Sequence, residues 1–376
     1  MKILVICPLT SNSGGSVTSW SISKQLADMG HTVYFIERGF RKESKKQATN
    51  IHYLHSVDFV PFLPLNILLS MLFNILAVII LRPDLVFALK PLPNSCLPAI
   101  IAKLFGTKNI LHINDLDYEF YKDGILKKIM KFFYRFFPSI FDKVSFPSPK
   151  LMDYVREDIG LPEEKTMLLL QGVDCQRFKN ISAGEELKES LKLTGKRIIV
   201  YIASLGITAS FETIAGIFYK ILQSAENTRI LVIGDGFYLQ KFKQDISKFS
   251  IDDKVVFTGF VKYDRIPAYI NLADIGINYM DEDKANSFRV PIKVKEYLAA
   301  GLPVVCNDVG DYEILRDHIN IAADEDQFVS MVLKLLENGY GRDEREIRFM
   351  EDNYSWSKII QDFNSNINLF VNPAVT

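Results

Sequence analysis

Lys293 and Glu296 lie three positions apart in the C-terminal half of the chain, at the start of a segment with the pattern of a short helix. Residues with this spacing share one face of a helix. We expect the helix to end at Ala299-Ala300-Gly301 and a short buried parallel strand to follow at Pro303–Cys306. An ammonium group beside a carboxylate suits a ligand with both a diphosphate and a vicinal diol, as in a sugar nucleotide. By themselves, a Lys and a Glu on one helix are usually a solvated ion pair.

A second polar group, Asn114, Asp115, Asp117 and Glu119, follows an expected buried strand at Asn109–Ile113. In α/β sheets, ligands bind at the carboxyl ends of the strands. There, Asp115 or Asp117 could position or deprotonate a hydroxyl group of an acceptor, with Asn114 and Glu119 binding beside it. The alternative is a solvated acidic loop.

Further candidates follow other expected strands. Lys90 comes after one of them and is expected to meet a phosphate group at the same edge of the sheet. Gly14 and Gly15 lie between the first strand and the first helix, where backbone amides can approach an anion, although a plain tight turn explains them equally well. His112 is as compatible with a core histidine as with a site residue.

Apolar segments of strand length alternate with helical patterns in two series, which predicts an α/β fold with two doubly wound parallel sheets. The expected strands of the first series are Lys2–Cys7, Thr32–Ile36, Asp84–Leu89, Asn109–Ile113, Val144–Phe146 and Thr166–Leu170. Those of the second are Arg197–Ile202, Arg229–Ile233, Val255–Thr258, Ile275–Tyr279 and Pro303–Cys306.

The composition excludes some classes of function. The chain has 376 residues and a net charge of −1, so nothing indicates binding to nucleic acid. Its four cysteines lack metal-ligand spacing and are expected to be free thiols in a reducing compartment. No metal site is expected. The N-terminus lacks the pattern of a signal peptide, which favours a cytoplasmic location.

Two segments suggest contact with a membrane. Residues 65–81 are apolar, but Asn66, Ser70 and Asn74 form a polar stripe, so we expect a helix that packs or lies on a membrane rather than spans it. Residues 125–137 combine aromatic residues with a basic stripe of Lys127, Lys131 and Arg135. This pattern is typical of a helix lying on an anionic bilayer, although a buried helix with outward-reaching basic groups is the alternative.

The segment Pro291–Val305 resembles the donor-binding signature of GT-B glycosyltransferases, in particular family 4, where a glutamate before an A-x-G-x-P-V-V run binds the ribose. Gln171–Phe178 is similar to the N-G-V-D-x-x-x-F segment at the end of the first domain in that family. The resemblance implies two Rossmann-like domains facing each other across a cleft. Residues 1–178, with a C-terminal helix at about 356–376, would bind the acceptor, and residues 195–355 would bind the donor.

The resemblance also assigns roles. It implies metal-independent, retaining transfer of a sugar from a nucleotide sugar, such as a UDP- or GDP-sugar, to a lipid-linked or polysaccharide acceptor in surface glycan synthesis. No cofactor is implied, and the enzyme would lie on the inner face of the cell membrane. Lys293 would stabilise the leaving diphosphate and Glu296 would bind the ribose. The donor loops would contain Gly14, Gly15, Gly206, Gly234 and Gly259.

The chain departs from the family pattern at three places. The loop 203–210 lacks the usual Arg and Lys, Phe288 occupies the place of the first acid of an E-x7-E pattern, and Asn114 replaces a histidine. A degenerate, non-catalytic binding partner is therefore one alternative. A nucleotide-sugar 2-epimerase is another, although only five histidines are present.

Overall fold

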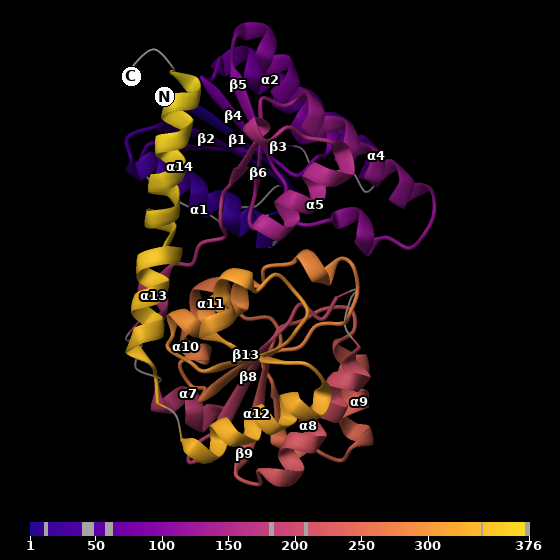
Figure 1. The fold of residues 1–376 in the computed structure, drawn as a ribbon, viewed down its shortest axis with the longest axis vertical. Coiled ribbons are helices and arrows are strands. Elements are labelled where there is room, and N and C mark those ends of the chain that lie inside the picture. The colour runs from indigo at the N-terminus through magenta and orange to yellow at the C-terminus, as the bar shows by residue number, and fades with distance from the viewer. Residues whose placement is uncertain are drawn as a thin grey trace. The chain divides into compact units, whose positions relative to one another are not determined.

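The computed structural model describes residues 1–10, 14–39, 49–56, 63–179, 184–206, 210–339 and 341–372. The chain divides into two compact units (Figure 1). Unit 1 comprises Met1–Gly172 and Trp356–Thr376, and unit 2 comprises Val173–Ser355. Each unit is built around its own parallel β-sheet.

Unit 1 contains a seven-stranded sheet with the order β3-β2-β1-β4-β5-β6-β7. Its strands are β1 (Lys2–Thr10), β2 (Thr32–Arg38), β3 (Ile51–Ser56), β4 (Leu85–Leu89), β5 (Lys108–His112), β6 (Lys143–Phe146) and β7 (Thr166–Leu168). Its α-helices are α1 (Gly14–Asp28), α2 (Leu63–Leu81), α3 (Pro93–Ala102), α4 (Ile125–Ile140), α5 (Pro149–Ile159) and α14 (Trp356–Val371).

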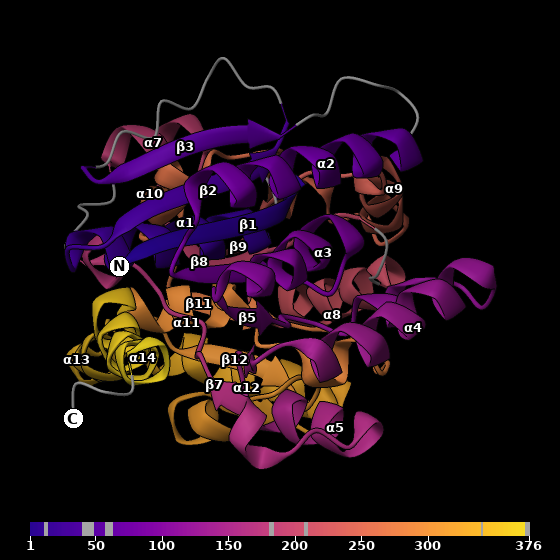
Figure 2. The same ribbon diagram turned by 90° about the horizontal axis from the view of Figure 1, so that it is seen from above.

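The sheet of unit 1 is covered on both faces, which explains its apolar strands. From β1 the chain first adds strands in one direction and then, from β4, in the other. Because parallel crossovers are right-handed, this reversal puts α1 on one face and α2, α3, α4 and α5 on the other. Figure 2 shows α2, α3 and α4 side by side in this order. Helix α14 packs beside α1 and places Phe363 against Phe87 of β4, at 5.9 Å between ring centroids.

Unit 2 contains a six-stranded sheet with the order β10-β9-β8-β11-β12-β13. Its strands are β8 (Arg197–Ile202), β9 (Thr228–Ile233), β10 (Val255–Phe257), β11 (Ile275–Asn278), β12 (Val304–Asn307) and β13 (Asn320–Ala322). Its α-helices are α6 (Cys175–Phe178), α7 (Glu185–Ser190), α8 (Phe211–Ser224), α9 (Leu239–Lys248), α10 (Ile266–Ile270), α11 (Ile292–Ala299), α12 (Glu325–Asn338) and α13 (Glu344–Tyr354). The strand order reverses between β8 and β11, which marks the expected ligand edge.

The boundary between the units lies at Gly172 rather than at residue 178. The reason is that α6 contacts α10, α11 and α13 of unit 2. The N–H of Val173 also donates to the carbonyl of Tyr354, at 2.8 Å. Helix α7, which precedes the expected start of the donor domain at residue 195, belongs to unit 2 as well.

Helix α2 buries its polar stripe and exposes apolar side chains, the reverse of the usual arrangement in a surface helix. Asn66, Ser70 and Asn74 are buried, and Asn74 donates through Nδ2 to the carbonyl of Asn94, at 2.7 Å. The opposite face exposes six apolar side chains, Leu65, Leu68, Leu72, Leu76, Ile79 and Ile80. Within the described residues, Pro64–Leu81 is the one helical stretch long and apolar enough to cross a membrane, and 28% of it is buried. The polar stripe therefore serves packing inside unit 1.

Candidate active site

The site in unit 2 is centred on the first turn of α11. Lys293 is partly buried, and its Nζ donates to the carbonyl oxygen of Ile202 at 2.8 Å. Ile202 is the last residue of β8, so this contact places the ammonium group at the strand-order reversal. The same Nζ lies 5.2 Å from the ring centroid of Tyr201. The fold thus brings the cation to the edge at which α/β sheets bind ligands.

Glu296 lies one turn further along α11 and is only 3% exposed. Burial raises its pKa to about 7, against the lowering effects of a hydrogen bond with Tyr263 and of the Lys293 charge. Its Oε1 accepts no hydrogen bond from any described residue. A buried carboxylate oxygen without a partner carries a cost of desolvation, which a hydroxyl group of a ligand would remove.

The pKa of Lys293 is shifted in the opposite direction, below its usual value. Burial lowers its pKa to about 7, and the charge of Arg289 adds to this effect, while Cys306 and Glu296 oppose it. The ammonium form is therefore only partly populated at neutral pH. An approaching diphosphate would favour that form through charge attraction.

The glycines of the expected donor loops have different structural roles. Gly234 has a φ of 145°, and a Cβ atom there would collide with the backbone carbonyl of Ala203. The N–H of Gly234 also donates to the carbonyl of Gly259 at 3.1 Å. Gly206 is less constrained, since an added Cβ would lie 3.5 Å from Ser204 Oγ. The close contact between loops therefore requires Gly234, whether or not a ligand binds there.

In unit 1, Lys90 follows β4 and lies next to the start of α1. Its backbone has a φ of 61°, which is unusual for a residue other than glycine. A Cβ atom added to Gly15 would lie 4.0 Å from Lys90 Cε. β1 and β4 are the neighbours at which the strand order reverses, so Gly15 and Lys90 lie together at the ligand edge of this sheet. The structure describes Gly14 as the first residue of α1.

Lys90 forms an ion pair with Asp117, at 2.5 Å between Nζ and Oδ1. Burial alone would lower the pKa of Lys90, but the carboxylates of Asp117 and Asp115 raise it above the usual value. The expected phosphate-binding lysine thus already neutralises a carboxylate of the same site. This arrangement favours an uncharged hydroxyl acceptor over a phosphate group at Lys90.

The other acidic residues of the acceptor loop have unequal surroundings. Glu119 pairs with Lys127, at 2.9 Å. Asp115 is partly buried, and the Oδ1 of Asn114 is buried and accepts no hydrogen bond from the described residues. In this loop, the Oδ1 atom of Asn114 is therefore available to accept a hydrogen bond from a ligand, whereas the Glu119 carboxylate is engaged by Lys127.

His112 is a core residue. It is 1% exposed, and its Nδ1 lies 2.9 Å from Ser145 Oγ. Burial lowers its pKa to about 3, so the imidazole is neutral at physiological pH. Of the two interpretations that the sequence allows, the structure favours the structural one.

Sequence reasoning missed several polar residues. Glu37, at the end of β2, is 1% exposed and accepts hydrogen bonds from Ser16 and Tyr53. Lys295 is 2% exposed, and burial lowers its pKa to about 7. Tyr263 interacts with Glu296 from a distant part of the chain. A charged residue inside an apolar strand, as at Glu37, was the available signal, whereas no local pattern indicates Tyr263.

The helix expected at 125–137 is α4, and its basic stripe is engaged within unit 1. Lys127 pairs with Glu119 and Asp123, and Arg135 pairs with Asp158 at 2.7 Å. Its solvent-facing side exposes the apolar residues Ile125, Leu126, Ile129, Phe132 and Phe136, together with the basic residues Lys128 and Arg135. The attraction to anionic lipid expected from the stripe is therefore reduced by these acidic partners.

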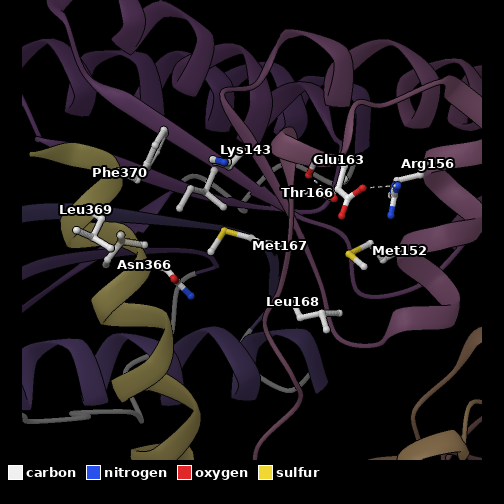
Figure 3. Close-up of a pocket in the computed structure, with 12 residues that line it drawn as sticks. Lys143, Met152, Arg156, Glu163, Thr166, Met167, Leu168, Asn366, Leu369 and Phe370 are labelled. Atoms are coloured by element: carbon white, nitrogen blue, oxygen red, sulfur yellow. Dashed lines mark hydrogen bonds and ion pairs between the residues drawn. The ribbon is translucent and has the colours of Figure 1, made fainter. Parts of the chain in front are cut away.

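A hollow of about 650 Å³ lies at the other end of the sheet in unit 1, next to the edge strand β7 (Figure 3). Helices α5 and α14 border it, with Met152, Arg156 and Phe370 among its lining residues. None of the residues that we predicted as site residues lines it. In the described part of the chain, no group of three or more His, Cys, Asp and Glu side chains is arranged to hold a metal ion.

The two parallel sheets with their strand-order reversals define the GT-B fold, an assignment that agrees with solved structures. A sucrose-phosphate synthase from Thermosynechococcus elongatus superposes with a TM-score of 0.77 at 12% identity, covering 100% of both chains. Anabaena HepE in complex with UDP and glucose superposes with a TM-score of 0.76 at 15% identity, covering 98% of this chain and 99% of the other.

Sequence models of two families match the chain and identify the family. Glycosyltransferase Family 4 matches residues 12–177, and Glycosyl transferases group 1 matches residues 196–338. The chain belongs to the family 4 glycosyltransferases. The predicted fold class and family are thereby confirmed.

Curated relatives act on varied acceptors, according to their names. The alpha-monoglucosyldiacylglycerol synthase of Streptococcus pneumoniae is 22% identical over 53% of this chain and 46% of its own length. A GDP-mannose-dependent phosphatidylinositol monomannoside mannosyltransferase of Mycobacterium tuberculosis is 24% identical over 40% of each chain. The N-acetyl-alpha-D-glucosaminyl L-malate synthase of Bacillus anthracis is 21% identical over 85% of this chain and 81% of its own length. The chain thus spans about half the length of the first two of these relatives.

Proposed function

We propose that this enzyme transfers a sugar from a nucleoside diphosphate sugar to a hydroxyl group of a lipid-linked or glycan acceptor, in the synthesis of a surface glycan. The observation that carries the proposal is Glu296, a buried carboxylate with an unpartnered oxygen, one turn away from the cation of Lys293. A ribose diol would supply a partner for Glu296 Oε1, and a diphosphate would supply negative charge beside Lys293. Transfer proceeds without a metal ion and with retention of configuration.

In the donor site, Lys293 and backbone amides of the loop after β8 stabilise the charge that develops on the leaving diphosphate. Glu296 accepts hydrogen bonds from the ribose hydroxyls and orients the nucleotide. In unit 1, Asp115 or Asp117 orients the acceptor hydroxyl and takes its proton. Asp117 already pairs with Lys90 through Oδ1 and accepts a hydrogen bond from Tyr134 through Oδ2, so in this role it would exchange one of these contacts for the acceptor hydroxyl.

The names of relatives support the substrate classes. One relative is named as the synthase of a glycolipid, and another is named for GDP-mannose and a phosphatidylinositol mannoside. A solved structure of the same fold contains UDP and glucose. We therefore propose a UDP- or GDP-sugar as the donor and a lipid-linked acceptor.

The first test is a thermal-shift panel of UDP-, GDP- and ADP-sugars. We expect one sugar nucleotide to raise the Tm, by an amount that corresponds to RT ln(1 + [L]/Kd), about 2.7 kcal/mol at a concentration of 100 Kd. Release of the nucleoside diphosphate in the presence of a lipid extract then tests transfer. Binding without release would instead support the non-catalytic partner, and no stabilisation by any member of the panel would contradict the donor site.

We further propose peripheral association with the inner face of the cell membrane. The exposed apolar side chains of α4 and the leucine-rich outer face of α2 support it. Because Lys127 and Arg135 already pair with carboxylates, apolar insertion contributes more than charge attraction.

A charge placed on the exposed face of α4 should weaken binding to lipid vesicles. Phe132 is 57% exposed, and we expect Phe132→Glu to lower vesicle partitioning at least tenfold, since insertion of a phenyl ring contributes about 1.5–3 kcal/mol. Phe237→Glu in unit 2, where the ring is 90% exposed, is the matched control and should leave partitioning unchanged. Co-sedimentation with vesicles measures both variants. Equal binding of Phe132→Glu and the wild type would exclude α4 as the membrane contact.

A further inference from the structure

The inward face of α4 reaches the acceptor loop through Tyr134. This residue is 3% exposed, and its hydroxyl lies 2.5 Å from Asp117 Oδ2 and 3.0 Å from the carbonyl oxygen of Asp115. The N–H of Asp117 in turn donates to the Tyr134 oxygen at 3.3 Å. One side chain of α4 therefore contacts the carboxylate and the backbone of the loop.

Three more contacts join the same loop to α4. Lys127 pairs with Glu119 at 2.9 Å, and the rings of Tyr118 and Tyr134 meet edge to face with centroids 5.2 Å apart. The ammonium group of Lys131 lies 5.8 Å from the centroid of Tyr118. Three consecutive loop residues, 117 to 119, thus rest on α4.

Asp117 connects Tyr134 to Lys90, because its carboxylate contacts both side chains. The two oxygens of its carboxylate are used separately, one by Tyr134 and the other by Lys90. Lys90 lies at the strand-order reversal beside Gly15. A shift of α4 would therefore move Asp117 and, through it, the ammonium group at the ligand edge.

The opposite face of α4 is the exposed apolar face described above. The part of α4 before Pro138 contains both the apolar face and Tyr134, and backbone hydrogen bonds within the helix join them, so a shift of that face moves Tyr134 with it. We propose that Tyr134 is a positioning residue that couples occupation of this apolar face by a lipid surface to the geometry of Asp117 and Lys90. This inference rests on the proposed function in placing the acceptor at residues 114–119.

Hydrogen exchange of the full-length protein tests the coupling without an identified acceptor. In the free protein, Tyr134→Phe should speed exchange of segment 114–120 about tenfold, since it removes a hydrogen bond to a charged group. The probe for the apolar face is vesicles of equal parts phosphatidylglycerol and phosphatidylcholine. They should slow exchange in segments 114–120 and 125–140 of the wild type, but only in 125–140 of Tyr134→Phe.

The control is Tyr121→Phe, a neighbouring tyrosine that is 42% exposed, and it should behave as the wild type. Lys127→Ala, which removes a contact at the edge of the loop, should weaken the response of 114–120 in part and serves as the second variant. Vesicle protection of 114–120 that persists in Tyr134→Phe would overturn the proposal, as would the absence of any vesicle effect on the wild type. Failure of the donor panel would contradict the proposed function alone, because exchange does not depend on a nucleotide sugar.

Discussion

Replacing Glu296 by Gln should raise the Kd of the sugar nucleotide about hundredfold. The carboxylate can accept hydrogen bonds from both ribose hydroxyls, and hydrogen bonds to a charged group contribute about 1.5–3 kcal/mol each. The amide keeps the size of the side chain but has one acceptor oxygen and no charge. Isothermal titration with the UDP- or GDP-sugar selected by the thermal-shift panel measures the effect.

The pH dependence of donor binding adds a second readout for the same residue. Glu296 has a pKa raised to about 7, so the carboxylate needed for the ribose forms as the pH rises through 7. Lys293 has a pKa lowered to about 7, so the ammonium needed for the diphosphate disappears over the same range. Donor affinity should therefore have a maximum near pH 7. The two values belong to an interacting pair, which titrates as a unit.

Variants separate the two limbs of this profile. Glu296→Gln should remove the rise on the acidic side and keep the fall on the alkaline side, whereas Lys293→Met should do the reverse. Glu226→Gln, at an exposed position of unit 2, is the control and should keep the wild-type affinity and profile. Wild-type affinity in Glu296→Gln would exclude the proposed donor site, and a flat profile in the wild type would exclude the Lys293–Glu296 pair as its origin.

The same shifts affect the stability of the fold. Between pH 4.5 and about 7 the folded state binds more protons at Glu296 than the unfolded state, so the contribution of Glu296 to stability falls as the pH rises. Between about 7 and 10.5 the unfolded state binds more protons at Lys293, so its contribution rises with pH. Without a donor, the pair therefore destabilises the protein most near neutral pH. The destabilisation arises because both groups are buried, which disfavours their charged forms.

Replacing Gly234 by Ala should lower the free energy of unfolding of unit 2 by about 3 kcal/mol or more. Two effects combine at this position. The φ of 145° is unfavourable for any residue with a Cβ atom, and the new methyl group would overlap the carbonyl of Ala203. Backbone atoms of adjacent loops cannot yield as a flexible side chain can, so overpacking adds to the strain.

Gly206→Ala provides the matched comparison, because the added methyl group would lie at an ordinary contact distance from Ser204 Oγ and the backbone needs no left-handed conformation. We expect a change within about 0.5 kcal/mol for this variant. Urea unfolding followed by circular dichroism measures both. A Gly234→Ala protein as stable as Gly206→Ala would show that the loop after β9 adapts, contrary to the close packing in the structure.

The sequence by itself determined the class of fold and placed Lys293 and Glu296, the centre of the proposed donor site, on one helix. Strands β4, β8 and β9 are short apolar runs bounded by turns. Because a strand in a parallel sheet is buried on both faces, its own sequence is continuously apolar and can be recognised without knowledge of the fold. Lys293 and Glu296 were predicted together because helical spacing alone puts them on one face. The edge strands β3 and β13 were missed, since one contains two histidines and the other has three residues. Such strands are stabilised by pairing with a neighbour rather than by their own pattern.

Only the tertiary structure decided how the charges are paired. Lys90 and Asp117 are 27 positions apart and were predicted as separate ligand contacts, yet the fold makes them an ion pair with Tyr134 as a third member. The basic stripe of α4 was predicted to face lipid, whereas Glu119 and Asp158 neutralise much of it. Sequence spacing reports neighbours within one helix or strand. The partner and the burial of a charge, which set its pKa and its availability to a ligand, depend on residues that only the folded chain brings into contact.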